Sequence, residues 1–381
     1  MKKSSILLIC VLSASLLFAQ KNEPKVIKRI DQLIEKELRK STIHNAYLSV
    51  YSPSKNFEWH TAKGEFKDGS EVTLENPFYT ASIGKTFTAT AIGMLVDQGE
   101  LGFEDPISKY LPQEMIEGLH VLNGTDYGDE ILIRHLLQHT SGLPDYFGRE
   151  TADGSPGVLD LVLAEPDHFW EPEELITYAK DHYKPFFPPG TDYEYTDTEY
   201  VLLGLIVEKA GGKPLHEFFQ MLIFEPLAMN HTYLNRRSAA LNPTPKMAEM
   251  YADEYEVSSF TSLSADWAGG AIVSTGKDLI TFLMALRNEQ LVSAATWKAM
   301  QQWTDETKGM DYGFGLRKIS FRELSAALPR WQAIGHSGLN GTSMYYCPEL
   351  DIYIAGTLNQ LSASKEAVVL MAKVLMMCKK L

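Results

Sequence analysis

The sequence predicts an α+β protein in which strands from the two ends of the chain form one antiparallel sheet. Residues 46–52 and 57–66 are rich in aromatic and β-branched residues, and the intervening PSKN suits a turn, so together they predict a hairpin. Alternating character returns from about residue 312, where four strand candidates follow one another: YGFGLRKI, WQAIGHS, TSMYYCPE and DIYIAGTL. The chain between these two regions is mainly helical in character.

Helical periodicity predicts the remaining elements. Apolar residues recur at helical spacing over residues 25–40, 82–98, 131–138, 200–210 and 362–381. The first and last of these helices flank the predicted sheet. Two long loops rich in Pro, Gly and Asp, at 141–172 and 184–198, separate the central helices. Loops of this length inside a compact domain are usually functional.

The pattern also predicts how the chain is divided. We expect residues 20–381 to form a single domain, because the chain shows no internal repeat and no low-complexity tract. The sheet part covers about 20–78 and 265–381, and a large inserted helical lobe covers about 79–264. This arrangement leaves a cleft between sheet and helices, where ligand sites tend to lie.

Residues 1–19 have the layout of a secretory signal peptide. Lys2 and Lys3 form a positive start, residues 6–18 form an apolar run, and Ala19 offers a small residue for cleavage. The run is too short to span a bilayer comfortably, although an uncleaved anchor stays an alternative because Leu17 makes a weak cleavage site. We therefore expect a secreted or periplasmic protein with no stable membrane span after signal removal.

Composition and charge limit the partners. The 381 residues are 45% hydrophobic and carry a net charge of −14, without a basic stripe that could hold nucleic acid. We expect no cofactor and no metal: His135 and His139 have the spacing of a zinc helix, but Leu136 stands where that motif needs glutamate, so we interpret both as structural. Cys347 and Cys378 are the cysteines of the mature chain, and sequence leaves their pairing open, as it does the oligomeric state.

The stretch YTASIGKT, residues 79–86, allows two interpretations. A phosphate-binding loop needs glycine five positions before Gly84, and that position is Tyr79. The alternative is a serine nucleophile with a lysine three residues later, because residues three apart lie on one face of a helix and Lys85 then reaches Ser82. A serine hydroxyl needs a neighbouring base before it attacks a carbonyl carbon. By itself, however, this spacing also fits a helix cap followed by a surface lysine.

Two further stretches favour the nucleophile. PPGTDYEYTDTEYVLLG (188–204) and GHSGLNGTSMYY (335–346), together with SIGK (82–85), resemble the three motifs of the class C β-lactamase and D-alanyl-D-alanine carboxypeptidase superfamily. Further segments look like family segments in the expected order: ILIRHLLQHTSGLPDY, IFEPLAMNHTYL, AGGAIVSTGKDLITFL and YGFGL. The resemblance covers the chain from about residue 30 to near the C-terminus, and it implies a β-lactamase/transpeptidase-like fold.

The resemblance also implies catalytic roles. Ser82 would attack the acyl carbonyl and become acylated, and Lys85 would keep the site in the reactive protonation state. Tyr195 would be the base, because cations beside a buried tyrosine can lower its pKa enough for that role. Tyr193 and Tyr200 are nearby competitors, but the register from Pro189-Gly190 favours Tyr195.

The third motif is expected to bind substrate. His336 matches its first position, and Gly338 would leave room for substrate along the strand edge. Ser337 would form a hydrogen bond with the substrate or on the side of the site where Tyr195 lies. The backbone N–H of Leu339 would be the second oxyanion donor, beside that of Ser82.

Two departures from the family pattern bear on the substrate. Asp197 stands where the family often has asparagine, so it can pair with Lys85 but would repel a substrate carbonyl unless protonated. His336 replaces lysine and is expected to be uncharged at neutral pH, given an ordinary pKa of ~6.5.

We therefore predict an exported serine hydrolase acting on a small molecule or peptide with an acyl, amide or ester bond. It would be a D-Ala-D-Ala carboxypeptidase, D-aminopeptidase-like enzyme or esterase. The alternatives are a true class C-like β-lactamase and a non-catalytic penicillin-binding or sensor protein.

Overall fold

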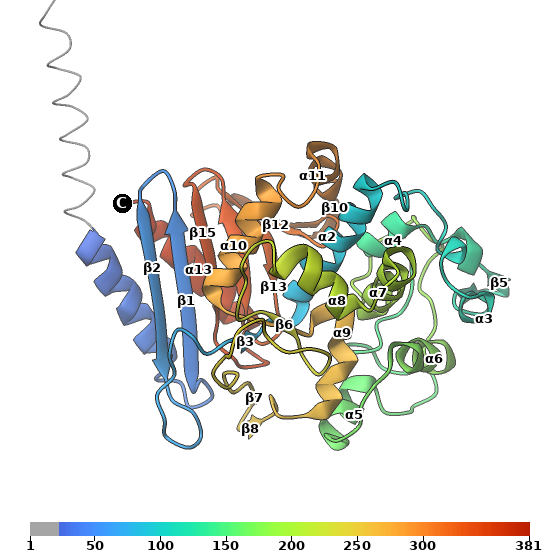
Figure 1. Ribbon diagram of the computed structural model, residues 1–381, viewed down its shortest axis with the longest axis horizontal. Helices are drawn as coiled ribbons and strands as arrows, with labels where there is room; N and C mark the ends of the chain where they lie inside the picture. Colours follow the sequence, from blue (N-terminus) through green and yellow to red (C-terminus); the bar gives the residue numbers. More distant parts are fainter. Residues whose placement is uncertain (1–22) are drawn as a thin grey trace, which may run out of the picture.

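A computed structural model describes residues 23–381, so the predicted signal peptide lies outside the described residues. The main sheet is antiparallel, and its strands come from both ends of the chain (Figure 1). Its spatial order is β10 (Thr304–Thr307), β11 (Met310–Tyr312), β12 (Arg317–Ser320), β13 (Gln332–Ser337), β14 (Ser343–Cys347), β15 (Ile352–Thr357), β1 (Asn45–Ser52) and β2 (Phe57–Gly64). The β1–β2 hairpin therefore joins the C-terminal strands through β1 and β15, which confirms the predicted fold class.

Two terminal helices cover one face of this sheet. A helix over residues 23–37 and α13 (Ser364–Cys378) share a core with the inward side chains of the strands, among them Leu48, Val50 and Ile354. Alternate residues point to opposite faces of a strand, so Tyr47 and Ser49 face the other side. There α10 (Gly276–Arg287) packs on β1, β14 and β15.

Most of the remaining helices gather in a lobe on the β10 side of the sheet (Figure 1). They are α2 (Gly84–Asp97), α3 (Gln113–Ile116), α4 (Ile133–Leu137), α5 (Val158–Ala164), α6 (Pro172–His182), α7 (Asp197–Gly211), α8 (Leu215–Phe219), α9 (Trp267–Gly270) and α11 (Ala294–Met300). The short α12 (Phe321–Leu324) follows β12 instead, and its Phe321 lies in the core shared by the sheet and the terminal helices. A small sheet, in the order β3 (Phe78–Tyr79), β9 (Ile272–Ser274) and β6 (Tyr233–Leu234), leads the chain into α2. Two hairpins complete the fold: β4 (Val121–Leu122) with β5 (Thr125–Asp126), and β7 (Tyr251–Ala252) with β8 (Tyr255–Glu256).

One predicted strand is divided in the structure. YGFGLRKI was expected to be continuous, but β11 ends at Tyr312 and β12 begins at Arg317. Gly315 between them has φ +62°, and a Cβ there would lie 2.5 Å from that of Ala89 in α2. The break therefore lets the chain pass close to the helix that carries Lys85.

Candidate active site

Ser82 lies in a 3₁₀ turn, Ala81–Ile83, that joins β3 to α2. The turn is held in place by Thr80, whose backbone N–H and hydroxyl both donate to the carbonyl of Ile272, at 2.9 and 2.8 Å. Ala81 has φ +47°, a conformation that non-glycine residues rarely adopt and that clusters at functional sites. This turn leaves Ser82 partly exposed on the wall of a cleft.

Lys85 follows one helical turn later and is completely buried. Its Nζ forms an ion pair with Asp197 and donates to the carbonyl of Gly269 at 3.2 Å. It also approaches Ser82 Oγ at 3.5 Å, the long limit for a hydrogen bond. Burial lowers the pKa of Lys85, but the charge and hydrogen bond of Asp197 together with the charges of Tyr195 and Asp266 outweigh burial, so the pKa is raised. Lys85 is therefore a fixed cation and not itself the base.

Asp197 is the first residue of α7, where the positive end of the helix dipole favours a carboxylate. Thr196 caps the helix, since its hydroxyl accepts from the N–H of Thr198 at 3.1 Å. A Cβ on Gly269 would lie 2.7 Å from Asp197 Oδ1 and 3.5 Å from Lys85 Nζ. The Lys85–Asp197 pair thus occupies space that only glycine at 269 leaves open.

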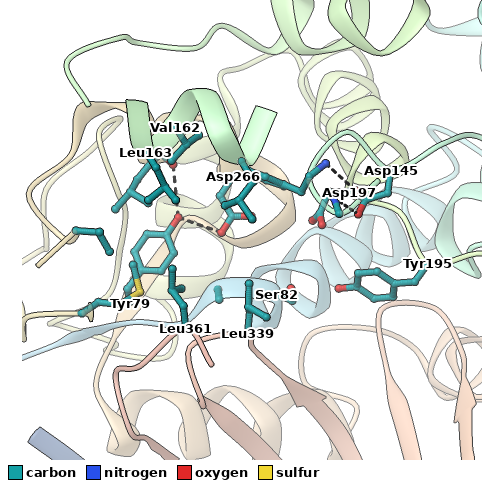
Figure 2. A pocket seen from close by; sticks show the side chains of 17 residues that line it. Tyr79, Ser82, Asp145, Val162, Leu163, Tyr195, Asp197, Asp266, Leu339 and Leu361 are labelled. Atoms are coloured by element: carbon teal, nitrogen blue, oxygen red, sulfur yellow. Dashed lines mark hydrogen bonds between the residues drawn. The ribbon is translucent and has the colours of Figure 1, made fainter. Parts of the chain in front are cut away.

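Tyr195 lines the cleft together with Ser82, and its hydroxyl points toward that serine (Figure 2). Lys85 Nζ lies 4.9 Å from the centre of its ring. Burial raises the pKa of Tyr195 to about 12 although Lys85 opposes the shift, because Asp197 acts in the other direction. The cations therefore act in the expected direction, but in the resting site burial outweighs them, so the pKa of Tyr195 lies above its usual value and not below it.

The two competing tyrosines have other positions. The hydroxyl of Tyr200 is buried and donates to the carbonyl of Leu137 at 3.0 Å. Tyr193 packs on His139 and Tyr312, with ring centres 6.1 and 6.2 Å away. Neither lines the cleft beside Ser82.

The third motif ends β13 beside the Ser82 turn. His336 is buried, its Nδ1 donates to the carbonyl of Ser337 at 2.8 Å, and its Nε2 accepts from the hydroxyl of Tyr312 at 3.0 Å. Burial lowers the pKa of His336 well below its usual value, and the charge of Arg317 adds to this effect. His336 is therefore neutral, as its sequence context predicts, and both of its ring nitrogens are already paired.

Gly338 permits a close approach between this motif and the Ser82 turn. A Cβ at 338 would lie 2.7 Å from the carbonyl oxygen of Thr80 and 2.8 Å from the Cβ of Ala81. A glycine at 338 thus makes room for the Ser82 turn, and the room that it would leave for substrate stays a prediction. Within residues 23–381 the backbone N–H groups of Ser82 and Leu339 make no hydrogen bond, which leaves both available to an oxyanion.

Arg317 on β12 is a charged group of the site that sequence reasoning missed. Its Nη1 donates to Ser337 Oγ at 3.1 Å, while Nε and Nη2 donate to the two carboxylate oxygens of Glu306 at 2.6 and 2.5 Å. Both side chains of this pair are largely buried. Arg317 follows directly after YGFGL, a segment that resembles the family, but its position beside the third motif becomes apparent only from the pairing of β12 with β13.

Two further carboxyl groups were also missed. Asp145 and Asp266 line the cleft with Asp197 (Figure 2). Burial and the neighbouring charge of Asp197 raise the pKa of Asp145 to about 6 and that of Asp266 to about 7. Asp145 accepts from the backbone N–H of Asp197 at 3.0 Å, and Asp266 accepts from the hydroxyl of Tyr79 at 3.0 Å. The cleft thus has three carboxyl groups, one of which, that of Asp197, is paired with Lys85.

The rest of the cleft wall is mainly apolar. The cleft encloses about 1000 Å³, part of it open to solvent, and its walls come from α5, the β7–β8 region and the turn after β13. The apolar lining residues include Phe147, Leu159, Val162, Leu163, Met250, Val257, Leu263, Leu339 and Leu361. The long loops predicted to be functional supply Asp145, Phe147 and Tyr195.

The remaining candidates have structural positions. His135 Nδ1 accepts from the backbone N–H of Leu132 at 3.2 Å at the start of α4. Cys347 and Cys378 are both buried free thiols. Among residues 23–381, no group of three or more His, Cys, Asp or Glu side chains could hold a metal ion.

This fold and this cleft define a serine hydrolase. The chain belongs to the beta-lactamase family, whose model matches residues 30–374. It is 30% identical over 276 residues to Penicillin-binding protein 4* of Bacillus subtilis, a match that covers 65% of this chain and 54% of that protein. The chain thus spans about half the length of such curated relatives.

Two solved structures share the fold. D-amino acid amidase from Ochrobactrum anthropi superposes with a TM-score of 0.77 at 22% identity, covering 93% of this chain and 99% of that one. D-stereospecific amidohydrolase from Streptomyces has a TM-score of 0.71 at 25% identity, covering 89% and 96%. No helix in residues 23–381 has the length and apolar character needed to cross a membrane.

Proposed function

We propose that the protein hydrolyses amides or esters of amino acids that carry a free amino group and an apolar side chain, through an acyl-enzyme on Ser82. The observation that carries this proposal is the charge of the cleft. Lys85 balances only one of the three carboxyl groups of Asp145, Asp197 and Asp266. A substrate ammonium group is attracted to such a site, whereas a substrate carboxylate is repelled.

The second cation near the site does not reverse this preference. A substrate carboxylate would need Arg317, but its guanidinium already binds both oxygens of Glu306. The apolar wall formed by α5 and its neighbours offers burial to a side chain, at about 25 cal/mol per Å² of apolar surface. Both features favour an aminopeptidase or amidase over a carboxypeptidase or β-lactamase.

The proposed chemistry assigns one role to each group. Ser82 Oγ attacks the carbonyl carbon, and the phenolate form of Tyr195 accepts its proton and later passes it to the leaving group. The N–H groups of Ser82 and Leu339 bind the oxyanion. Lys85 stays charged and stabilises the phenolate of Tyr195, and water then releases the acyl group by the same route.

The names of the structural neighbours support the amidase class, since one is a D-amino acid amidase and the other a D-stereospecific amidohydrolase. The second candidate function is a D-Ala-D-Ala carboxypeptidase, which Arg317 beside Ser337 would favour if Glu306 moved away. We further propose that residues 1–19 direct export, which mass spectrometry of the N-terminus from an exporting host would test.

A substrate panel tests the main proposal. D- and L-phenylalanine amide should be hydrolysed at least tenfold faster, by kcat/KM, than their N-acetyl forms, because acetylation removes the ammonium charge. The kcat/KM of the two free amides should also exceed that of a D-Ala-D-Ala peptide and that of a chromogenic β-lactam. Ser82→Ala should abolish both turnover and labelling by a fluorophosphonate. Equal rates for free and N-acetylated amides would refute the charge argument, and persistent labelling in Ser82→Ala would refute the assigned nucleophile.

A further inference from the structure

A buried pair of ionisable side chains lies directly behind Tyr195. His139 and Glu199 are fully buried, and His139 Nδ1 lies 2.5 Å from Glu199 Oε2. The other oxygen of Glu199 accepts from the backbone N–H of Ser141 at 3.1 Å. Burying such a pair is expensive, and apolar residues of similar size often serve stability as well or better. The proposed chemistry has so far given this pair no role.

The imidazole of His139 packs against the aromatic rings of the site. Its ring centre lies 4.3 Å from that of Tyr195 and 4.4 Å from that of Tyr312. His139 has φ +59°, so the backbone adopts a sparsely populated conformation to hold it there. Its Nε2 is buried without a hydrogen-bond partner among the described residues. The position is thus maintained at a cost in backbone conformation and hydrogen bonding.

The hydrogen bonds define the resting protonation state. The N–H of Thr196 donates to His139 Nδ1 at 3.3 Å, so Nδ1 is an acceptor and the ring proton is on Nε2. Burial raises the pKa of Glu199 well above its usual value and lowers that of His139. Glu199 is therefore a neutral acid that shares its proton with Nδ1.

Other charged and titratable groups surround the pair. From the neighbouring elements, those that face it are Lys85 on α2, Asp145, Tyr193 and Tyr195 in the loops, Tyr200 on α7, Tyr312 on β11, Arg317 on β12 and His336 on β13. The cations Lys85 and Arg317 disfavour a protonated His139 at rest. A negative charge on Tyr195 would act in the opposite direction, because its ring is among the nearest to the imidazole.

We propose that Glu199 and His139 are positioning residues that act on the reaction through Tyr195, by fixing its ring and by placing a positive charge against it while its hydroxyl is deprotonated. In this state the O–H bond of Glu199 breaks and an N–H bond forms at His139 Nδ1. The net charge of the pair is unchanged, and the new carboxylate keeps the N–H of Ser141. When the phenolate accepts the proton of Ser82, the shared proton returns to Glu199. This inference rests on the proposed roles of Ser82 and Tyr195.

The test is the pH dependence of Ser82 labelling by a fluorophosphonate, which needs no knowledge of the substrate. Glu199→Gln keeps the shape and donates an amide N–H to Nδ1, but it has no proton to transfer. We expect the rise of its labelling rate with pH to be shifted upward by about one pH unit relative to the wild type. At pH 7 this shift corresponds to about tenfold slower labelling. His139→Asn, which tolerates the positive φ, should show the same shift.

His135→Gln is the matched control, because this histidine is also buried in the same segment but contacts none of the tyrosines of the site. It should keep the wild-type profile. If folded Glu199→Gln and His139→Asn both follow the wild-type profile, the pair is only structural and the inference fails. If Glu199→Gln does not fold, His139→Asn decides by the same criterion. If the wild type itself is not labelled at Ser82, it is the proposed function that fails.

Discussion

Glu306 holds Arg317 in a two-point ion pair, with Nε and Nη2 of the guanidinium at 2.6 and 2.5 Å from the two carboxylate oxygens. Two-point pairing of this kind fixes the orientation of the guanidinium as well as its charge. The third nitrogen, Nη1, is thereby directed at Ser337 Oγ, 3.1 Å away, at the end of the strand nearest Ser82. Arg317 thus contributes a hydrogen bond to the site while its charge is largely offset.

This pair predicts that Glu306→Gln changes substrate preference. Removing the carboxylate leaves the charge of Arg317 uncompensated beside the third motif, so substrates with a carboxylate should gain. We expect the ratio of kcat/KM for a D-Ala-D-Ala peptide to that for phenylalanine amide to rise about tenfold, equivalent to ~1.4 kcal/mol. The matched control is Glu104→Gln, which breaks an exposed pair with Arg134. An unchanged ratio in the folded variant would contradict the assigned role of Glu306.

Gly269→Ala should disrupt the Lys85–Asp197 pair. The added Cβ would lie 2.7 Å from Asp197 Oδ1 and 3.5 Å from Lys85 Nζ, so one of the two side chains must move. Misplacement of a catalytic group by about 1 Å can cost ~100-fold in rate, and we expect a loss of kcat of that order. The control is Gly102→Ala, because the nearest neighbouring atom to a Cβ there is Asp105 Oδ2 at 3.6 Å and its φ is not positive. Steady-state kinetics at matched thermal stability would decide, and wild-type kcat in Gly269→Ala would show that the pair tolerates displacement.

Leu163→Gln should weaken binding of substrates with an apolar side chain, without adding a charge to the cleft. Leu163 is 43% exposed on the cleft wall, so the change alters the wall without opening the core. We expect KM for phenylalanine amide to rise about tenfold, since ~1.4 kcal/mol is less than the full burial of one side chain. KM for alanine amide should change less. Leu324→Gln, at a position 39% exposed and outside the cleft, is the control, and an equal effect of both changes would exclude an apolar subsite at α5.

The sheet and the main helices could be predicted because their periodicity is local. The β1–β2 hairpin and the last three strands have residues that suit a buried sheet, and the structure confirms them. By contrast, β10 (Thr304–Thr307) is short and polar, and α5 lies in the segment 141–172, whose Pro, Gly and Asp content indicates a loop. These elements are formed by packing against the rest of the lobe, which no local pattern records.

The residues of the site likewise include some that the sequence predicts and some that it does not. Ser82, Lys85, Tyr195 and Asp197 stand in recognisable spacings, and the structure brings them together on one cleft wall. Asp266 reaches the cleft only through tertiary structure, as do Asp145 and Arg317. The pKa of Tyr195 could not be predicted either, because it depends on burial and on how far Asp197 offsets Lys85.

The raised pKa of Asp266 predicts an unusual dependence of stability on pH. In the unfolded chain this carboxyl ionises near pH 3.8, but in the folded protein it retains its proton up to about pH 7. The folded state therefore binds more protons than the unfolded state between these values, so the free energy of unfolding falls as pH rises from about 4 to 7. Asp266→Asn removes this loss and can still accept the hydrogen bond from Tyr79.

We therefore expect Asp266→Asn to raise the free energy of unfolding by on the order of 2 kcal/mol at pH 8 and by much less at pH 4. The measurement is urea unfolding at the two pH values, with exposed Asp181→Asn as the control. The same variant should weaken binding of an amino-acid amide at pH 8, because an ionised carboxyl group near the ammonium group is lost. Stabilisation that is equal at pH 4 and pH 8 would mean that Asp266 has the same protonation state at both values, which would contradict its raised pKa.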